Sequence, residues 1–273
     1  MQTNAEAVFA EINRACDQNK VGLALSPTNV TEDASKRIHN HWATSHFYCT
    51  KTSIKEMVLK SSNGYHVRNI PVFIERGNKP EDKYQDMLIE FDESGKISDL
   101  TIALSQHQYA NVITTSVADV RQRQIILEFV ENFRTAYNCK DLPYIEKVFS
   151  DEALIITGKY GKDLEGTGKK LELTTKNKHQ YMDNLRQAFT KNAYINVKFD
   201  EITVKQHDGK PNLYYVYLTQ EWNSSTYSDI GWLLLKIEFR DNDHPLIWVR
   251  AWQPLDSGNP ERRIKGEDIL EEY

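Results

Sequence analysis

IEFDESGKISDLTIAL, residues 89–104, and IEFRDNDHPLIWVRAW, residues 237–252, decide the fold of this chain. The two stretches have the same length and align without a gap. In each, a strand that ends in Ile-Glu-Phe runs into a polar turn and returns as a second strand, which predicts a hairpin. A chain that carries the same hairpin twice is expected to contain two copies of one domain.

Length and charge narrow the classes of protein to which this chain can belong. At 273 residues it has room for two domains of ordinary size, and each can bury a core without disulfides. The 34 Lys and Arg against 39 Asp and Glu give a net charge of −5, with no basic stripe for nucleic acid. No apolar stretch is long enough to span a membrane. We therefore expect a soluble protein without nucleic-acid or membrane partners, cytoplasmic by default and exported if a signal peptide has been removed.

The cysteines and histidines do not form a metal-binding pattern. Cys16, Cys49 and Cys139 are odd in number and far apart, which fits neither a disulfide framework nor ligand spacing. Free cysteines of this kind are small, partly buried hydrophobes in most proteins. His39 and His41 are two residues apart on a predicted helix and would point in different directions. We expect no metal and no cofactor.

The second half of the chain changes its apolar period from 3.6 to 2. Helical spacing predicts helices over 119–138, from Asp141 to Ser150, and over 175–192, with a strand at 153–157 and a Gly- and Lys-rich loop at 158–170 between the last two. Alternating residues then predict strands at 194–205, 213–222, 231–239 and 246–252. Helices followed by an antiparallel meander indicate an α+β fold with the helices on one face of a curved sheet.

The first half shows a weaker version of the same order. Helices are predicted at 5–20 and 32–42, and strands at 46–50, 54–61, 65–75, 86–91 and 97–104. The polar run 106–119 has no apolar period and is the predicted linker. The domain boundaries that follow are a diverged first domain at 1–110, a second domain at 119–255 that holds the candidate pocket, and a charged C-terminal tail at 256–273.

From Arg123 to Trp252 the chain resembles the nuclear transport factor 2-like (NTF2-like) superfamily, whose cone fold is shared by ketosteroid isomerase and scytalone dehydratase. The resemblance rests on ILEFVENFRTAYNCKDLPYIEKVFSDEALII (126–156) and on KIEFRDNDHPLIWVRAW (236–252). It implies two tandem α+β cone domains, each with helices packed on a curved antiparallel sheet. It does not imply a function, because this superfamily contains both enzymes and binding modules.

The catalytic positions of ketosteroid isomerase are replaced in this chain. That family uses a Tyr on the first helix, an Asp base at the end of the first strand and a protonated Asp on a central strand. The matching positions here are Phe133, Thr157 and Leu235, and none of these can transfer a proton as that mechanism requires. We therefore assign no catalytic residue and favour a protein that is not an enzyme.

Strand alternation predicts which side chains face the inside of the second cone. If Leu235 points inward, a period of two places every second residue of the neighbouring strands beside it. The candidate ligand-binding set then contains one phenol from the first helix, one amide, one guanidinium and three indoles: Tyr137, Gln220, Trp222, Trp248, Arg250 and Trp252. The first copy has Leu100, Ile102 and Leu104 at the matching strand positions, which predicts a filled core.

Arg250 separates the functional alternatives. A buried charge needs a partner, so Arg250 either pairs with an internal acid such as Asp229 or Glu221, reaches the mouth of the cone, or anchors an anionic ligand. We favour a non-catalytic small-molecule-binding or protein-interaction module that takes a small apolar or anionic ligand. An isomerase- or dehydratase-like enzyme using Tyr137, Arg250 and Gln220, and a structural scaffold with a closed core, stay open. A homodimer or an inter-domain contact through the sheet faces is also expected.

Overall fold

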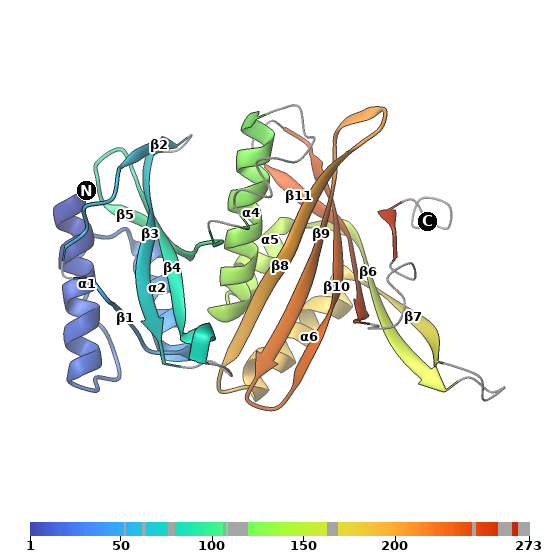
Figure 1. Cartoon of the computed structure of the whole chain (residues 1–273), viewed down its shortest axis with the longest axis horizontal. Coiled ribbons are helices and arrows are strands. Elements are labelled where there is room, and N and C mark those ends of the chain that lie inside the picture. The colour runs from blue at the N-terminus through green and yellow to red at the C-terminus, as the bar shows by residue number, and fades with distance from the viewer. Residues whose placement is uncertain are drawn as a thin grey trace. The chain divides into compact units, whose positions relative to one another are not determined.

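The computed structural model describes residues 1–51, 53–61, 64–75, 80–105, 108, 120–162, 169–241, 244–255 and 264–266. The chain divides into two compact units of helices and curved, mainly antiparallel sheets (Figure 1). The first unit comprises Met1–Ser105, Glu131–Asp141 and Ala193–Asn196, and the second comprises Gln106–Val130, Leu142–Asn192 and Val197–Tyr273. Most of the predicted linker and tail lies outside the described residues. In the described part of the chain, no helix is long and apolar enough to cross a membrane.

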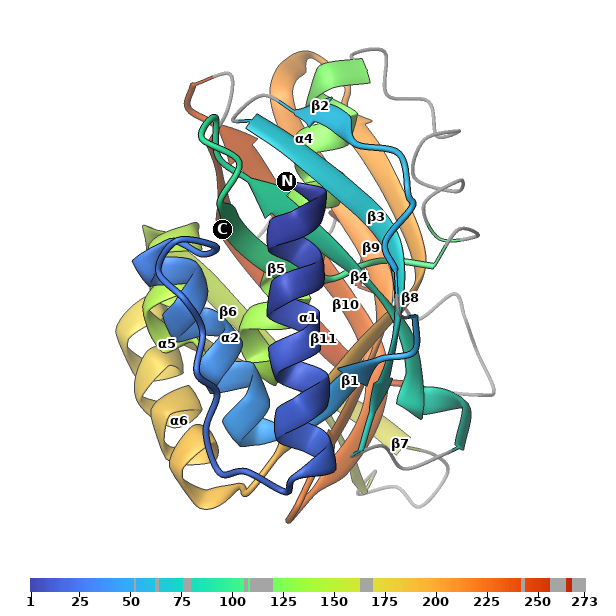
Figure 2. The same cartoon turned by 90° about the vertical axis from the view of Figure 1, so that its left-hand side faces the viewer.

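The first unit places two helices on one face of a five-stranded sheet (Figure 2). Its strands follow the order β1-β3-β4-β5, with β2 paired to β3. The element bounds are α1 Gln2–Asp17, α2 Glu32–Thr44, β1 Phe47–Cys49, β2 Leu59–Ser61, β3 Gly64–Ile74, the 3-10 helix η1 Pro80–Lys83, β4 Tyr84–Phe91 and β5 Ile97–Ile102. The strand predicted at 54–61 is thus shortened to its last three residues.

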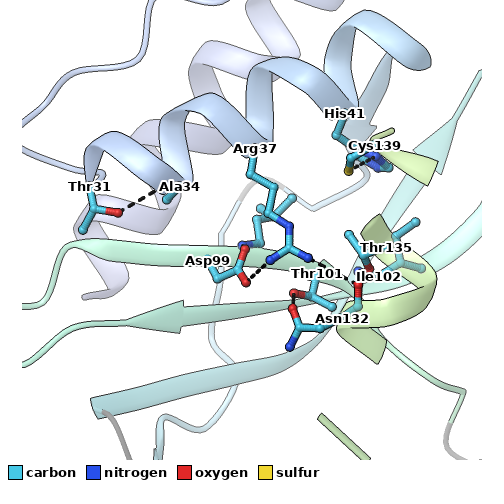
Figure 3. Close-up of polar contacts among 11 residues, drawn as sticks. Thr31, Ala34, Arg37, His41, Asp99, Thr101, Ile102, Asn132, Thr135 and Cys139 are labelled. Carbon is cyan, nitrogen blue, oxygen red and sulfur yellow. Dashed lines mark hydrogen bonds and ion pairs between the residues drawn. The ribbon is translucent and has the colours of Figure 1, made fainter. Parts of the chain in front are cut away.

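α2 packs on this sheet through apolar residues at helical spacing. Thr31 starts the helix, because its Oγ1 accepts a hydrogen bond from the backbone N–H of Ala34 at 3.3 Å (Figure 3). Ala34, Ile38 and Trp42 then recur every four residues along α2. Their side chains are buried in one cluster with apolar residues of α1 and of the sheet. The equivalents of the second-cone positions, Leu100, Ile102 and Leu104, are each at most 2% exposed.

Helix side chains cover the edge of β5, where the described strand order ends. The backbone N–H of Ile102 donates to Thr135 Oγ1 at 3.0 Å, and the N–H of Leu104 donates to Glu131 Oε1 at 2.7 Å. N–H groups two residues apart on a strand are about 6.6 Å apart, and residues four apart on a helix are about 6 Å apart along its axis. One helix face therefore presents acceptors in register with one strand edge.

A buried ion pair holds one of these acceptors in place. Glu131 is fully buried, and both terminal nitrogens of Arg68 on β3 donate to its carboxylate, with 3.0 Å between Nη1 and Oε2. A paired charge of this geometry satisfies the carboxylate that burial would otherwise destabilise. The pair therefore fixes the helix residues 131–135 against β3 and β5.

The second unit has a six-stranded sheet in the order β7-β6-β11-β10-β9-β8. Neighbours β7–β6, β11–β10 and β10–β9 are antiparallel, whereas β6 and β11 run parallel. The helix α4 Val120–Asn138 belongs to this unit up to Val130 and to the first unit from Glu131 onward. The other elements have the bounds α5 Leu142–Val148, β6 Phe149–Lys162, β7 Lys169–Asn177, α6 Lys178–Lys191, β8 Ile195–His207, β9 Lys210–Ser224, β10 Ser228–Phe239 and β11 Pro245–Pro254. The hairpins β4–β5 and β10–β11, predicted from the repeated stretches, are both present.

The loop predicted at 158–170 is wrong over most of its length. β6 continues to Lys162 and β7 begins at Lys169, while 163–168 lie outside the described residues. Exposed strands lack the apolar alternation by which strands are recognised. The next helix starts at 178 rather than 175, because Asn177 forms a capping box with Gln180.

Replacing Thr135 by valine tests the closure of the β5 edge. Valine has nearly the same shape but offers no acceptor, so the buried N–H of Ile102 would lose its partner. We expect Thr135→Val to lower the free energy of unfolding by about 1–3 kcal/mol, measured by urea denaturation. Thr135→Ser keeps the hydroxyl and should lose clearly less; equal losses in the two variants would contradict the role of the hydroxyl.

Candidate functional site

The inner face of the second sheet is defined by strand register. Leu235 pairs with Arg250 and Leu233 pairs with Trp252, so these four side chains point to one face. By the same rule Gln220 lies on this face opposite Gly231, and Trp222 lies opposite Asp229. We call this side of the sheet the inner face.

Arg250 is held on the inner face by an amide and an aromatic ring. It is 7% exposed, and its Nη2 donates to Gln220 Oε1 at 3.1 Å. Its guanidinium carbon lies 5.3 Å from the ring centroid of Tyr181 on α6, which is within the range of a cation–π contact. The helix α6 therefore covers the inner face at the level of Arg250.

Asp229 is an acid whose pKa is influenced by the charge of Arg250. Burial raises the pKa of Asp229, while a hydrogen bond from Tyr227 and the charge of Arg250 act in the opposite direction. Its Oδ1 is buried and has no hydrogen-bond partner among the described residues. Glu221, the other acid considered as a partner for Arg250, accepts a hydrogen bond from Asn223 at 2.8 Å.

A glycine on β10 makes room for the Trp252 ring. A Cβ atom at Gly231 would lie 2.5 Å from Cε2 of Trp252 and 2.3 Å from the backbone oxygen of Gln253. The absence of a side chain therefore lets the indole lie over the strand. Trp252 is 8% exposed, but Thr157, which pairs with it on β6 and shares its face, is exposed. Solvent thus reaches the inner face next to the indole.

The structure brings four of the six candidate residues onto the inner face: Gln220, Trp222, Arg250 and Trp252. Trp248 differs, because a bulge pairs Ile237 with Ile247 and leaves Trp248 without a partner in the register. The guanidinium of Arg240 lies 5.0 Å above the Trp248 ring. Tyr137 groups with the first unit, where it is buried and packs edge-on against Phe133.

Two residues of the inner face and one residue of α6 that contacts it were not among the candidates. Gly231 and Asp229 lie two and four residues before Leu233 on β10, so continuing the alternation of this strand towards its start would have placed both on the inner face. Tyr181 had no such signal: helical spacing shows that it faces the core but not which strand residue it meets.

The first unit contains a buried thiol and imidazole in contact. Cys139 Sγ and His41 Nδ1 are 3.2 Å apart (Figure 3), and both residues are less than 5% exposed. A nucleophile beside a base is an arrangement used in covalent catalysis. Here, however, burial raises the pKa of the Cys139 thiol to about 12. Burial, reinforced by the charges of Arg37 and Arg134, lowers the pKa of His41 to about 4. Both groups are therefore neutral at pH 7, and the reactive thiolate is not populated.

His41 also borders a small cavity. The cavity has room for one water molecule, and polar side chains from Thr44, Asn138 and Asn196 contribute to its wall. Within the described part of the chain, His41 Nε2 is buried without a hydrogen-bond partner. Two ligands do not make a metal centre, and the described residues contain no cluster of three or more His, Cys, Asp or Glu placed to hold one.

Comparison with known proteins connects this architecture to solved structures. No protein-family model matches the chain, and no curated protein matches it. Among solved structures, an NTF2-like protein from Cytophaga hutchinsonii is 14% identical, with a TM-score of 0.37 over 49% of this chain and 98% of its own.

Two further solved structures extend the comparison. An NTF2-like protein from Pseudomonas aeruginosa is 8% identical, with a TM-score of 0.37 over 50% of this chain and 99% of its own. Bd1075 from Bdellovibrio bacteriovorus is 16% identical, with a TM-score of 0.40 over 60% of this chain. This chain spans 46% of the length of Bd1075. The two NTF2-like proteins each match about half of this chain.

The stability of the first unit should fall with acid because of His41. The unfolded histidine titrates near pH 6.5, whereas the folded one titrates near pH 4. Between these values only the unfolded chain binds the proton, so stability is complete above pH 6.5 and is lost as the pH falls to 4. We expect a loss of about 3 kcal/mol from this residue, measured by urea denaturation across pH 4–7.

Matched histidine variants separate this effect from general acid sensitivity. His41→Phe should flatten the pH dependence of the free energy of unfolding, whatever its effect on stability at pH 7. His179→Gln removes a histidine whose side chain is 86% exposed and is the comparison variant for the loss of a buried one. His66 is also buried with a lowered pKa, so it contributes to the slope that remains. An unchanged slope in His41→Phe would contradict the assignment.

Proposed function

We propose that the second unit is a non-catalytic binding module that takes a small molecule with a flat apolar body and an anionic group. One observation carries the proposal: Arg250 is fixed by Gln220 and Tyr181 on an inner face that is open to solvent at Thr157. A concave, mainly apolar wall with a few convergent polar groups is typical of ligand sites. A charged group already oriented by its neighbours binds an anion with little further loss of entropy.

Each side chain of the inner face then has a distinct part in binding. The guanidinium of Arg250 would donate charge-assisted hydrogen bonds to a carboxylate. The indoles of Trp222 and Trp252 would stack against the apolar body of the ligand. The buried Oδ1 of Asp229, which has no hydrogen-bond partner in the described structure, would accept a hydrogen bond from a hydroxyl or amine of the ligand.

A charged and a neutral probe of the same shape test the role of Arg250. We expect 2-naphthoate to bind the wild-type chain more tightly than 2-naphthamide, as measured by ligand-observed NMR titration. Arg250→Gln should weaken 2-naphthoate binding about 10- to 100-fold, because a hydrogen bond to a charged group contributes about 1.5–3 kcal/mol. Binding of 2-naphthamide should change little.

Arg240 provides the control, since it is an exposed arginine of the same unit. Arg240→Gln should leave both affinities unchanged. Equal binding of the two probes to wild type, or equal losses in the Arg250 and Arg240 variants, would contradict an anion site at Arg250. Failure of both probes to bind would favour the structural scaffold.

Proton transfer is a second candidate function, favoured by the raised pKa of Asp229. Acids with a pKa raised by burial are common at catalytic sites, and Asp229 shares the inner face with Gln220 and Trp222. An isomerase- or dehydratase-like reaction would then use Asp229 together with Arg250. Tyr137, named in that hypothesis from the sequence, is not needed for it.

The ionisation of Asp229 can be tested through stability. A carboxyl whose pKa is raised in the folded state destabilises the fold at a pH above that pKa, so the cost is absent at low pH and appears as the pH rises. We therefore expect Asp229→Asn to be more stable than wild type at pH 7, with the difference shrinking as the pH falls towards about 4, the ordinary pKa of an aspartate. A difference independent of pH would contradict a raised pKa.

We further propose that the two units are diverged copies of one fold. The aligned stretches put Met87 with Leu235 and Ile102 with Arg250, and these residues form matching pairs in β4–β5 and β10–β11. Each hairpin also contains one irregularity in its register. Beyond the hairpins, β11 continues the sheet through β6, whereas helix side chains cover β5. A homodimer or an inter-domain contact through the sheet faces stays a prediction.

A further inference from the structure

The second sheet has another apolar face, opposite to Arg250. Because side chains alternate along a strand, Val249 and Ala251 point away from the inner face, as does Leu234 on β10. These side chains are at most 6% exposed and form one cluster with Ile156 and Tyr215. We call this cluster the outer face.

A short C-terminal segment, residues 264–266, lies on the outer face. Ile264 packs against the cluster, and its backbone N–H donates to Gln253 Oε1 at 2.9 Å. Two residues later, the N–H of Gly266 donates to the hydroxyl of Tyr217 at 3.2 Å. Gln253 is only 2% exposed, so its amide is a fixed acceptor. The segment is the short red piece near the C-terminus in Figure 1.

The third residue of the segment has to be glycine. A Cβ at position 266 would lie 2.6 and 2.7 Å from two ring carbons of Tyr215, which is closer than carbon atoms can pack. The side chain of Ile264 packs against the apolar cluster, whereas the side chain of Lys265 is exposed. Two donors, one apolar side chain and one excluded side chain therefore specify a tripeptide of the form Ile-x-Gly.

We propose that the outer face is a peptide-recognition site for an Ile-x-Gly segment, occupied in cis by residues 264–266 of the same chain. In peptide-binding domains, hydrogen bonds to the peptide backbone give affinity, and the fit of individual side chains gives specificity. The proposal is independent of the ligand site, because Arg250 lies on the opposite face of the sheet. The segment is displaceable by the same segment of a second chain.

Tethering explains why the wild-type chain should not bind a second segment readily. A covalently linked segment has an effective concentration in the millimolar range, so a free peptide competes poorly with it. A change that unseats the tethered segment should expose the outer face to a free peptide. Gly266→Val does this within the full chain, since any Cβ at 266 meets the Tyr215 ring. Ile264→Asp unseats the segment by a different route.

The test uses a fluorescein-labelled peptide of residues 256–273 and the full chain, with binding followed by fluorescence anisotropy. We expect the peptide to bind the Gly266→Val chain and the Ile264→Asp chain at least about 10-fold more tightly than wild type. Adding Gln253→Leu to either chain should weaken binding about 3- to 10-fold, as expected for one neutral hydrogen bond.

Peptide variants test whether binding to the outer face depends on the amino-acid sequence of the peptide. A peptide that carries Gly266→Val should bind at least about 10-fold more weakly than the unmodified peptide, whereas one that carries Lys265→Arg should bind equally well. The proposal is overturned if the opened chains bind no better than wild type. It is also overturned if the Gly266→Val peptide binds as well as the unmodified one, because the outer face would then bind peptides without regard to their sequence.

Discussion

The first unit depends on one constraint: the backbone donors at the end of its sheet must find acceptors away from water. An unpaired buried N–H group costs about as much free energy as a whole hydrogen bond contributes. Thr135 and Glu131 meet this requirement because a turn of helix and two residues of strand have nearly the same length. The contact with Arg68 then compensates the charge that this solution places in the core.

A second set of polar contacts also links helices to β5 in the first unit. Arg37 on α2 pairs with Asp99 on β5 and also donates to the backbone oxygen of Asn132 (Figure 3). Thr101 donates to the side chain of Asn132 at 3.3 Å. Burial raises the pKa of Asp99, and the charge of Arg37 opposes that rise. Polar groups here join two helices to one strand, beside the apolar cluster that both α2 and β5 contribute to.

The sequence was informative where a period repeats and uninformative where a single contact decides. The pairing of Leu235 with Arg250 follows from alternation and from the repeated hairpin. The bulge at Trp248 could not be foreseen, because one extra residue in a strand leaves no trace in composition. The acceptors Glu131 and Thr135 were also invisible, since polar residues on an amphipathic helix normally indicate its solvent side. Asn177 carried a recognisable cap signal, because Gln180 stands three residues after it.

The burial of the cysteines has a consequence for the chemical environment that this protein can tolerate. Burial is the largest cause of a raised pKa at Cys16, Cys49 and Cys139 alike. Oxidants and electrophiles react with the thiolate form, which is scarce at neutral pH when the pKa is high. The buried thiols of Cys49 and Cys139 should therefore be slow to oxidise or alkylate in the folded chain, whereas Cys16 is only partly buried and is the cysteine that reagents reach first.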